Sequence, residues 1–361
     1  MGKGASRDED TAARTLGETL VPGAAGWPPV QGRVLFLQAH AATTRLAADI
    51  HDWTCVQGMR AQAAELEAWG CNVHAEFPDA NGEPYDAALV LPARQRDLAR
   101  ANLARAVASV RPGGQVRMAM SNLEGARSGE RDLRDLIGTL ESQSRSKCRV
   151  FGGIVEAAGV ERDLLETWLA LDAPREILDG RYISRPGLFA WDRVDAASAL
   201  LAGSLPADLQ GSVADLGAGY GYLATEALRR SPGIAELHLY DADARALVPA
   251  RENLARTLAA LGRTLPVELH WHDVTHGLPR RHDAVICNPP FHAGRADRPQ
   301  LGQAFIEAAA GALHPGGHLW LVANRHLPYE ATLGRHFATV RTMAEGDGFK
   351  VIHAQRGAGP A

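Results

Sequence analysis

The chain has 361 residues, a length that favours two compact domains over a single one. Apolar residues make up 46% of it and charged residues 22%, which is typical of a globular protein. Because no run approaches about 18 uncharged apolar residues, we expect no membrane-spanning helix. The net charge of −4 excludes a strongly basic protein, so a nucleic-acid partner would have to be bound by a local basic patch.

The N-terminus and the cysteines bear on where the protein is located. Residues 1–10 are polar and mixed in charge, unlike a secretory signal or a transit peptide. The cysteines form no Cys-x-x-Cys pair, which argues against a structural zinc and a disulfide framework. They are Cys55, Cys71, Cys148 and Cys287. We therefore expect a cytoplasmic monomer that has neither a membrane nor a metal as a partner.

The first half of the chain alternates between predicted strands and helices. Residues 1–27, rich in Gly, Ala and Pro, are expected to form a loose N-terminal arm. An Ala-rich helical stretch follows the first predicted strand, and a strong helix is predicted over 97–110. The strands are predicted at 33–37, 71–75, 85–92 and from 115 onward. This alternation predicts an α/β domain over residues 28–175 with a doubly wound, mostly parallel sheet.

The second half, residues 176–361, repeats this plan. Strands are predicted at 212–216, 237–241, 267–271, 283–287 and 318–322, and helices at 222–230 and 245–261. In both halves a strand, a helix, a Pro-Gly-Gly sequence and another strand follow in the same order, and the last strand reaches an asparagine (Asn122 and Asn324). We interpret this order as an internal duplication.

The differences between the two copies indicate that the candidate active site lies in the second copy. The sequence Asp-Leu-Gly-Ala-Gly-Tyr-Gly at 215–221 is matched with Leu-Phe-Leu-Gln-Ala-His-Ala at 35–41, and Asn288 is matched with Leu91. The first copy thus lacks both the glycines and the polar group of the candidate site. We expect it to be a degenerate domain that helps to bind the substrate.

A glycine-rich turn between a strand and a helix predicts the ligand site of the second copy. Asp215 precedes Gly217, Gly219 and Gly221, and such glycines let backbone N–H groups approach a ligand and adopt positive φ. A dinucleotide turn would have a glycine three residues after Gly219, where this chain has Tyr222. The aspartate instead suits a cationic ligand, such as the methionine part of S-adenosylmethionine.

Two further acidic residues follow the next two strands. Asp241 lies where an acidic side chain in such folds accepts hydrogen bonds from ribose hydroxyls. Asp273 is positioned to receive an adenine amino group, although a surface residue or a helix cap explains it equally well. The glycine turn, the acidic strand end at Asp241 and Asp273 follow in this order, which predicts a nucleoside-containing cofactor.

The candidate catalytic residues are Asn288, Pro289, Pro290 and Phe291, at the end of the fourth strand of the second copy. The side-chain oxygen of Asn288 and the carbonyl of Pro289 can accept hydrogen bonds from an exocyclic amine and hold it in line with a methyl group. Phe291 offers a face for stacking of the target base. The alternative is a loop in which two prolines simply end a strand.

Other kinds of site are less well supported. His270, His272, His276 and His282 suggest a metal site, but no cysteine lies near them, and scattered histidines are the simpler interpretation. A Ser-His-Asp hydrolase would need a Gly-x-Ser-x-Gly sequence, which the chain lacks.

Taken together, these motifs resemble those of the bacterial small-subunit ribosomal RNA guanine-N2 methyltransferases. The sequence is also similar to the related large-subunit methyltransferases. The resemblance covers nearly the whole chain. It is carried by the duplication and by Gly187-Leu188-Phe189, Asp195, Ser198, residues 215–221, Asn288 to Gly294, Leu321 to Asn324, Leu327-Pro328-Tyr329 and Phe349-Lys350-Val351. Ala197 stands where the family commonly has glycine.

The resemblance implies two tandem Rossmann-like methyltransferase domains, of which the N-terminal one is degenerate. It also implies S-adenosylmethionine as cofactor and N2-methylation of a guanine in 16S rRNA of the 30S subunit. Asp215, Gly217, Gly219, Asp241, Asp195 and Ser198 would then contact the cofactor, and residues 288–291 the target base. Of 38 basic residues 35 are arginine, and those in 94–105 and 127–149 are candidate RNA contacts unless they only form solvated helix faces.

Several alternatives remain open at this stage. A 23S rRNA guanine-N2 methyltransferase fits the same motifs, and a protein glutamine-N5 methyltransferase shares the Asn-Pro-Pro-Phe sequence. The protein enzymes usually carry a small helical domain, which the duplicated α/β half argues against. The other two alternatives are a nucleotide-dependent oxidoreductase and a non-catalytic ribosome-assembly factor.

Overall fold

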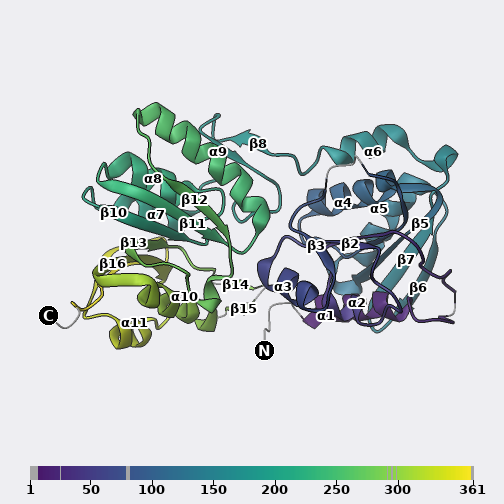
Figure 1. The fold of residues 1–361 in the computed structure, drawn as a ribbon, viewed down its shortest axis with the longest axis horizontal. Coiled ribbons are helices and arrows are strands. Elements are labelled where there is room, and N and C mark those ends of the chain that lie inside the picture. Colours follow the sequence, from purple (N-terminus) through teal and green to yellow (C-terminus); the bar gives the residue numbers. More distant parts are fainter. Residues whose placement is uncertain are drawn as a thin grey trace. The chain divides into compact units, whose positions relative to one another are not determined.

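The computed structural model of the chain consists of two compact units, Met1–Ala173 and Pro174–Ala361. It describes residues 7–24, 26–78, 82–290, 292–293, 296–297 and 299–358. The division falls two residues before the expected boundary between 175 and 176. Each unit is an α/β body with helices covering its sheet (Figure 1).

The N-terminal unit is built on a seven-stranded sheet in the order β3-β2-β1-β4-β5-β7-β6. The first five of these strands are parallel, and β7 runs antiparallel to both of its neighbours. The strands are β1 (Val34–Leu37), β2 (Trp53–Val56), β3 (Asn72–His74), β4 (Tyr85–Val90), β5 (Val110–Ser121), β6 (Glu141–Arg145) and β7 (Cys148–Ile154). The α-helices are α1 (Arg7–Glu18), α2 (Ala41–Thr44), α3 (Arg60–Ala68), α4 (Arg96–Ser109), α5 (Ala126–Ile137) and α6 (Arg162–Leu169), with one-turn 3₁₀ helices at Asn122–Glu124 and Ala157–Gly159.

The C-terminal unit repeats this topology with the strand order β12-β11-β10-β13-β16-β18-β17. Its strands are β10 (Gly211–Leu216), β11 (Ile234–Asp241), β12 (Val267–Trp271), β13 (His282–Cys287), β16 (Leu313–Asn324), β17 (Thr339–Gly346) and β18 (Phe349–Gln355). Its helices are α7 (Ala196–Ser204), α8 (Tyr222–Arg230), α9 (Ala244–Leu261), the 3₁₀ helix η3 (Val274–His276), α10 (Pro299–Ala312) and α11 (Glu330–His336). Two short antiparallel pairs, β8 (Arg175–Ile177) with β9 (Tyr182–Ser184) and β14 (His292–Ala293) with β15 (Ala296–Asp297), lie outside the sheet. The predicted pair of Rossmann-like domains is therefore confirmed.

Both faces of the C-terminal sheet are buried, which explains why its central strands are rich in apolar residues. Along β10, Val213 packs into one core with residues of α7, α8 and α9. Its neighbours Ala214 and Leu216 pack into the opposite core with residues of α10. Asp215 lies between them in this alternation and has no exposed surface. A carboxyl group thus occupies the interior of the sheet.

The duplication extends to individual hydrogen bonds. Gly32 before β1 and Gly211 at the start of β10 both have positive φ, +76° and +69°. A Cβ at either would come within 2.1 Å of a carboxylate oxygen, of Asp86 and of Asp283 respectively. Each of these carboxylates accepts a hydrogen bond of 2.9 Å from the backbone N–H that follows the glycine. The same Gly–Asp clamp therefore joins the first and fourth strands of both units.

The Pro-Gly-Gly sequences have a common structural cause. A Cβ on the second glycine would lie 2.6 Å from the Asp86 carbonyl oxygen at Gly114, and 3.0 Å from the Asp283 carbonyl oxygen at Gly317. The glycine before each has a φ of about +80°. Helix α4 ends at Ser109, one residue before its predicted end, and α10 ends at Ala312, and both Pro-Gly-Gly sequences lie in the strands that follow, β5 and β16.

Two predictions for the N-terminal unit are wrong. The expected loose arm contains helix α1, whose Ala12, Ala13 and Leu16 are buried. The Ala-rich stretch contains strand β2 between a one-turn helix and α3. The four-residue strand β2 is too short to show a clear period, so its sequence did not distinguish it from a helix.

The comparison of the two copies also needs a correction of one residue. Val34 pairs with Ala87 and Val213 with Ala284, so Phe36, not Leu35, is the counterpart of Asp215. Gln38 is then the counterpart of Gly217, and it keeps a positive φ of +55°. The first copy has lost the aspartate and the glycines but has kept this backbone conformation.

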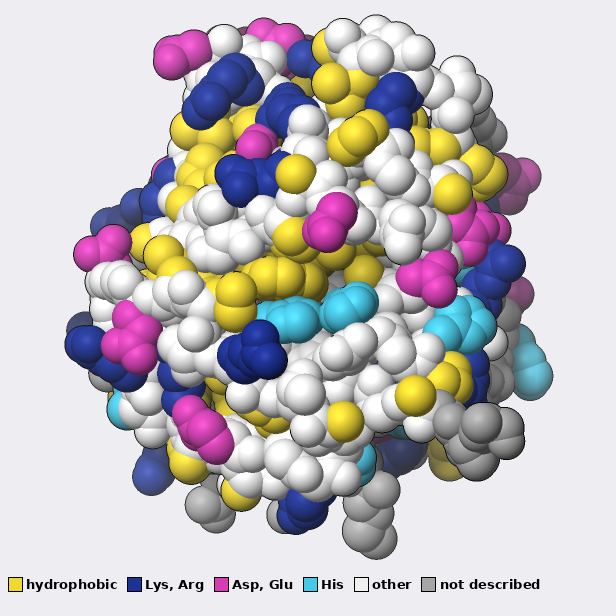
Figure 2. All heavy atoms as spheres, turned by 90° about the vertical axis from the view of Figure 1, so that its left-hand side faces the viewer, with side chains coloured by type: hydrophobic (Ala, Val, Ile, Leu, Met, Phe, Trp, Pro, Cys, Tyr) yellow, Lys and Arg dark blue, Asp and Glu magenta, His cyan; other side chains and the backbone are white. Residues whose placement is uncertain are grey.

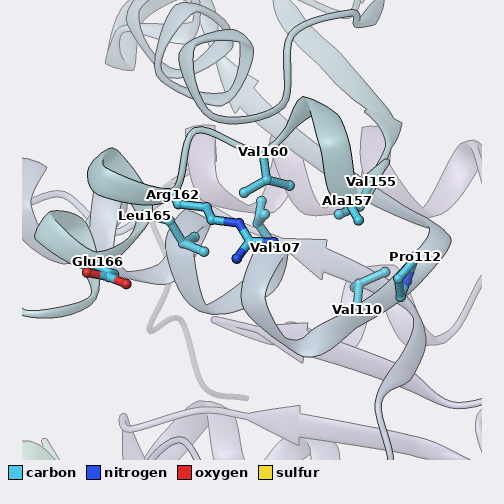
Figure 3. Close-up of a pocket in the computed structure, with 9 residues that line it drawn as sticks. All are labelled: Val107, Val110, Pro112, Val155, Ala157, Val160, Arg162, Leu165 and Glu166. Carbon is cyan, nitrogen blue, oxygen red and sulfur yellow. The ribbon is translucent and has the colours of Figure 1, made fainter.

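Two further features concern a membrane-spanning helix and a hollow in the surface. No helix among the described residues is long and apolar enough to cross a membrane. The N-terminal unit has a hollow of about 310 Å³, shown in Figure 3. Seven of its nine lining residues are apolar, with Arg162 and Glu166 as the exceptions, so it offers few polar partners for a ligand.

The glycine environments give a stability prediction. Gly317→Ala should lower the free energy of unfolding by about 1–3 kcal/mol, because its Cβ would press on the carbonyl oxygens of His314 and Asp283. Gly311→Ala, at the end of α10, is the matched control, because nothing lies within 4 Å of its Cβ. It should leave the protein as stable or more so. Chemical denaturation of both variants tests this, and equal effects would contradict the steric argument.

Candidate active site

The turn between β10 and α8 has the conformation that its glycines permit. Gly217, Gly219 and Gly221 have φ values of +72°, +55° and +83°, where residues with a Cβ are strained. The Gly217 N–H donates to the Tyr240 carbonyl oxygen at 2.8 Å, which fixes the turn against β11. A Cβ on Gly219 would meet nothing within 4 Å, so the turn faces open space at this point.

Asp215 is the buried acid beneath this turn. One carboxylate oxygen accepts a hydrogen bond of 3.1 Å from the Ala224 N–H of α8. The other is buried and has no hydrogen-bond partner among the residues that the structure describes. Burial, reinforced by Asp241, raises the pKa of Asp215 to about 8. This unused acceptor fits the cationic amino group of a methionine moiety.

Asp241 connects the end of β11 to the same turn. One of its oxygens accepts from the Gly219 N–H at 2.7 Å and the other from the Asp243 N–H at 2.8 Å. Burial raises the pKa of this carboxyl group to about 6 despite these hydrogen bonds. Because each carboxylate oxygen has two lone pairs, ribose hydroxyls can still be accommodated.

Asp273 acts locally as a helix cap. It precedes η3 and accepts from the Thr275 N–H at 3.0 Å and the Thr275 hydroxyl at 2.7 Å. Its other oxygen lies 3.3 Å from His276. Helix capping thus accounts for this side chain, and its contact with an adenine remains a prediction.

A buried asparagine that the sequence analysis did not single out holds the segment leading into α7. Asn253 of α9 donates to the carbonyl oxygens of Ile183 and Tyr220 at 2.7 and 2.8 Å, and it accepts from the Ile183 N–H at 2.7 Å. It therefore joins β9 to the residue between the second and third glycines. A polar residue on the otherwise apolar face of α9, beside Ala250 and Leu254, was the available signal.

Asn288 is held by two residues from the start of α7. Its Nδ2 group donates to the Asp195 carboxylate at 3.0 Å and to the Ser198 hydroxyl at 2.8 Å. Asp195 also caps α7 by accepting from the Ser198 N–H at 2.9 Å. An ionised carboxylate only accepts hydrogen bonds, so the amide nitrogen must face Asp195, and Oδ1 is left as an acceptor for a substrate. The structure thus places Asp195 and Ser198 at Asn288.

The loop after β13 lies next to the glycine turn. A Cβ on Gly217 would be 3.9 Å from the backbone carbonyl oxygen of Asn288. Pro289 is buried, Pro290 is exposed, and Phe291 lies outside the described residues. The structure therefore brings Asp215, the glycine turn and Asn288 together at the carboxyl ends of adjacent strands, as the sequence predicts.

The arginines proposed for RNA contact are largely engaged within the N-terminal unit. Arg100 makes a bidentate pair with Asp132 at 3.0 and 3.1 Å, and Arg105 pairs with Asp172. Arg134 and Arg149 share Glu130 in the same way. Figure 2 faces the C-terminal unit, on which basic and acidic side chains are also interspersed. The arginine content therefore does not translate directly into a basic surface.

The histidines weighed as metal ligands lie in different surroundings. His272 lies 2.6 Å from the Gly277 carbonyl oxygen, His276 is exposed beside Asp273, and His282 is buried at the start of β13. His270 lies on β12 next to His238 of β11.

A doubly wound sheet, a glycine turn above a buried aspartate and an oriented asparagine define the class of S-adenosylmethionine-dependent methyltransferases. The Methyltransferase small domain family matches residues 179–353. Ribosomal RNA small subunit methyltransferase C of Pseudomonas aeruginosa is 32% identical over 341 residues, 90% of this chain and 99% of that protein. Ribosomal RNA large subunit methyltransferase G of Shewanella amazonensis is 38% identical, over 46% of this chain and 43% of that protein.

A solved structure agrees with these relatives over both units. The T. thermophilus 16S rRNA N2 methyltransferase RsmC, in complex with AdoMet and guanosine, matches with a TM-score of 0.77 and 25% identity, covering 96% of this chain and 91% of that chain. The chain belongs to the ribosomal RNA small subunit methyltransferase C family.

The environment of Asp215 generates a binding prediction. Asp215→Asn should weaken S-adenosylmethionine binding about 10- to 100-fold, the value of a hydrogen bond to a charged group. Isothermal titration calorimetry measures this, with Asp208→Asn, an exposed aspartate of the same unit, as the control. Equal affinities would contradict the assignment.

Asp215→Asn, which should weaken cofactor binding, should stabilise the cofactor-free fold. The pKa of Asp215 is about 8 when folded, above its unfolded value of about 3.9. Between these values the folded state alone retains the proton, so the free energy of unfolding falls as pH rises towards 8. Asn cannot ionise, so the advantage of the cofactor-free variant over the parent should grow from pH 5 to pH 8.5 in thermal unfolding.

Proposed function

We propose that this protein transfers a methyl group from S-adenosylmethionine to the exocyclic N2 amine of a guanine in 16S rRNA. The observation that supports this most directly is the fixed orientation of the Asn288 amide. A guanine N2 amine is a hydrogen-bond donor whose lone pair is delocalised into the ring. Its recognition therefore requires acceptors, and Asn288 presents Oδ1 for this purpose.

The residues of this chain would act by binding and orienting the amine. The Asn288 Oδ1 and the Pro289 carbonyl oxygen would each accept one N–H of the amine, which directs the nitrogen lone pair towards the cofactor. When bound, S-adenosylmethionine supplies an electrophilic methyl group on a sulfonium. The amine nitrogen held by these two acceptors would receive that methyl group, and one of its N–H protons would then pass to water. Positioning of this kind is worth up to about 7–11 kcal/mol in favourable cases.

Further residues complete the proposed site. Asp215, below the glycine turn, would accept the methionine amino group, and Asp241 the ribose hydroxyls. Phe291 follows Pro290 in the sequence and would stack on the target base, a contact whose strength is typically about 1–3 kcal/mol per base. The roles of Asp273 and Gly221 in holding the cofactor are part of the same proposal.

The choice of 16S rRNA rests on how much of the chain each comparison covers. The small-subunit relative and the RsmC structure extend over both units, whereas the large-subunit relative matches less than half of the chain. The RsmC structure was determined with guanosine, which supports a guanine target. We further propose a cytoplasmic monomer acting on the 30S subunit, in which the N-terminal unit binds RNA.

The substrate assignment has a direct test. Labelled S-adenosylmethionine should transfer its methyl group to 16S rRNA or 30S subunits, and nucleoside analysis should identify N2-methylguanosine. Asn288→Ala should lower the turnover number by at least about 100-fold while cofactor affinity is retained. Transfer to 23S rRNA or to protein alone would disprove the assignment.

The role of Asp195 is tested by removing its carboxylate. Oδ2 of Asp195 accepts from both the Ser198 N–H and the Asn288 Nδ2 group, so Asp195→Asn can keep both hydrogen bonds through its amide oxygen and serves as the control. Asp195→Ala removes this acceptor, so the amide of Asn288 is no longer held in one orientation. We expect the turnover number to fall about 10- to 100-fold with little change in cofactor affinity. Ser198→Ala, which removes only a second acceptor, should have a smaller effect, and the reverse order would refute this role.

A further inference from the structure

Two neighbouring strands of the C-terminal unit place three ligand groups on one face of the sheet. In the register of β11 and β12, His238 lies opposite Glu268, and His270 is two residues further along β12. Side chains two residues apart on a strand point to the same face. Among the described residues, this is the single group of three or more His, Cys, Asp or Glu whose ligand atoms all lie within 4.8 Å of one another.

The three ligand atoms have the spacing of a metal site. His238 Nδ1 lies 3.2 Å from His270 Nε2, and Glu268 Oε2 lies 3.8 and 3.7 Å from these nitrogens. A triangle with sides of 3.2, 3.7 and 3.8 Å has a circumscribed radius of about 2.1 Å, so a single point lies about 2.1 Å from all three atoms. Zinc–imidazole bonds are about 2.0–2.1 Å and zinc–carboxylate bonds about 2.0–2.2 Å long.

The surrounding groups orient these ligands as in metal sites. The other nitrogen of His238 is buried without a hydrogen-bond partner among the described residues and lies 3.5 Å from the Glu236 carboxylate. A carboxylate behind a ligating histidine is the usual outer-shell partner. Arg280 donates to the second oxygen of Glu268 at 2.8 Å and so fixes that side chain.

Access also suits an ion. His238 is 1% exposed, whereas the Glu268 side chain is 50% exposed and that of His270 is 22% exposed, so an ion can enter from solvent. The adjacent His282 is not a fourth ligand, because its nitrogens lie 2.9 Å from the Ser212 hydroxyl and 3.2 Å from the Tyr240 hydroxyl.

We propose that His238, His270 and Glu268 bind a divalent transition-metal ion of the zinc class, with water completing the coordination. Two imidazoles and one carboxylate favour such an ion over Mg²⁺ or Ca²⁺, which prefer oxygen ligands. The ion would link β11 to β12 next to Tyr240, whose ring stacks on His270 at 4.3 Å and whose carbonyl oxygen holds the Gly217 N–H. The role is structural and lies outside the methyl-transfer step.

Metal titration of the tag-free full chain tests the proposal. Zn²⁺ should bind with one-to-one stoichiometry in the presence of excess Mg²⁺, and Co²⁺ should give the intense visible absorption of a four-coordinate site. Zn²⁺ at about one hundred times its dissociation constant should raise the melting temperature by about 5 °C or more. Failure of the parent protein to bind either ion would overturn the proposal.

Variants distinguish this site from adventitious histidine binding. Glu268→Gln, which keeps the shape of a half-exposed side chain, and His270→Ala should each weaken Zn²⁺ binding about 100-fold or more, and Glu236→Gln about 10-fold. The control is His353→Ala, which removes one ring of the stacked His318–His353 pair, where two ring nitrogens lie 2.9 Å apart. It should not change the affinity. Binding that survives Glu268→Gln, or that is lost with His353→Ala, would refute the assignment whatever the methyl-transfer activity.

Discussion

A side-chain amide has two ends of nearly equal size and opposite hydrogen-bonding character. At Asn288 the choice between them is made by Asp195, whose carboxylate accepts from Nδ2 while it also caps α7. The start of that helix therefore controls what β13 offers to a substrate. The rest of the proposed site depends on this contact, because a reversed amide would meet an amine donor with another donor.

Asp215 shows how the site conflicts with the stability of the fold. Its buried oxygen has no partner among the described residues, and leaving a buried acceptor unsatisfied costs about 1–3 kcal/mol. The N-terminal copy has Phe36 at the equivalent position, fully buried in an apolar core. Replacement of the acid by an aromatic ring removes this cost together with the ligand. Decay of a binding site is thus the expected course in a copy from which binding is no longer required.

The sequence predicted the architecture better than the local contacts, for a physical reason. Strands buried on both faces, such as β10 and β13, have apolar cores that lie between predicted turns and helices, and their order fixes the topology. The position of Asn288 beside the glycine turn followed from the same rule, since parallel strands end at one edge. Strand β2 was missed because its four residues are too few to show a clear period. The role of Asn253 depends on three backbone partners distant in sequence, and no local pattern contains them.

The two copies separate what the fold requires from what the chemistry requires. Both keep the Gly–Asp clamp at the start of the first strand, through Asp86 and Asp283, and both keep the second glycine of Pro-Gly-Gly against the carbonyl of that aspartate. They differ at the opposite ends of the same strands, where Asn288 and the glycine turn have no counterpart. Gln38 has a positive φ although it is not a glycine. The backbone conformation is therefore kept where the glycine that favours it has been replaced. Conservation of the frame therefore says nothing about activity, which is set by a few side chains at the carboxyl edge.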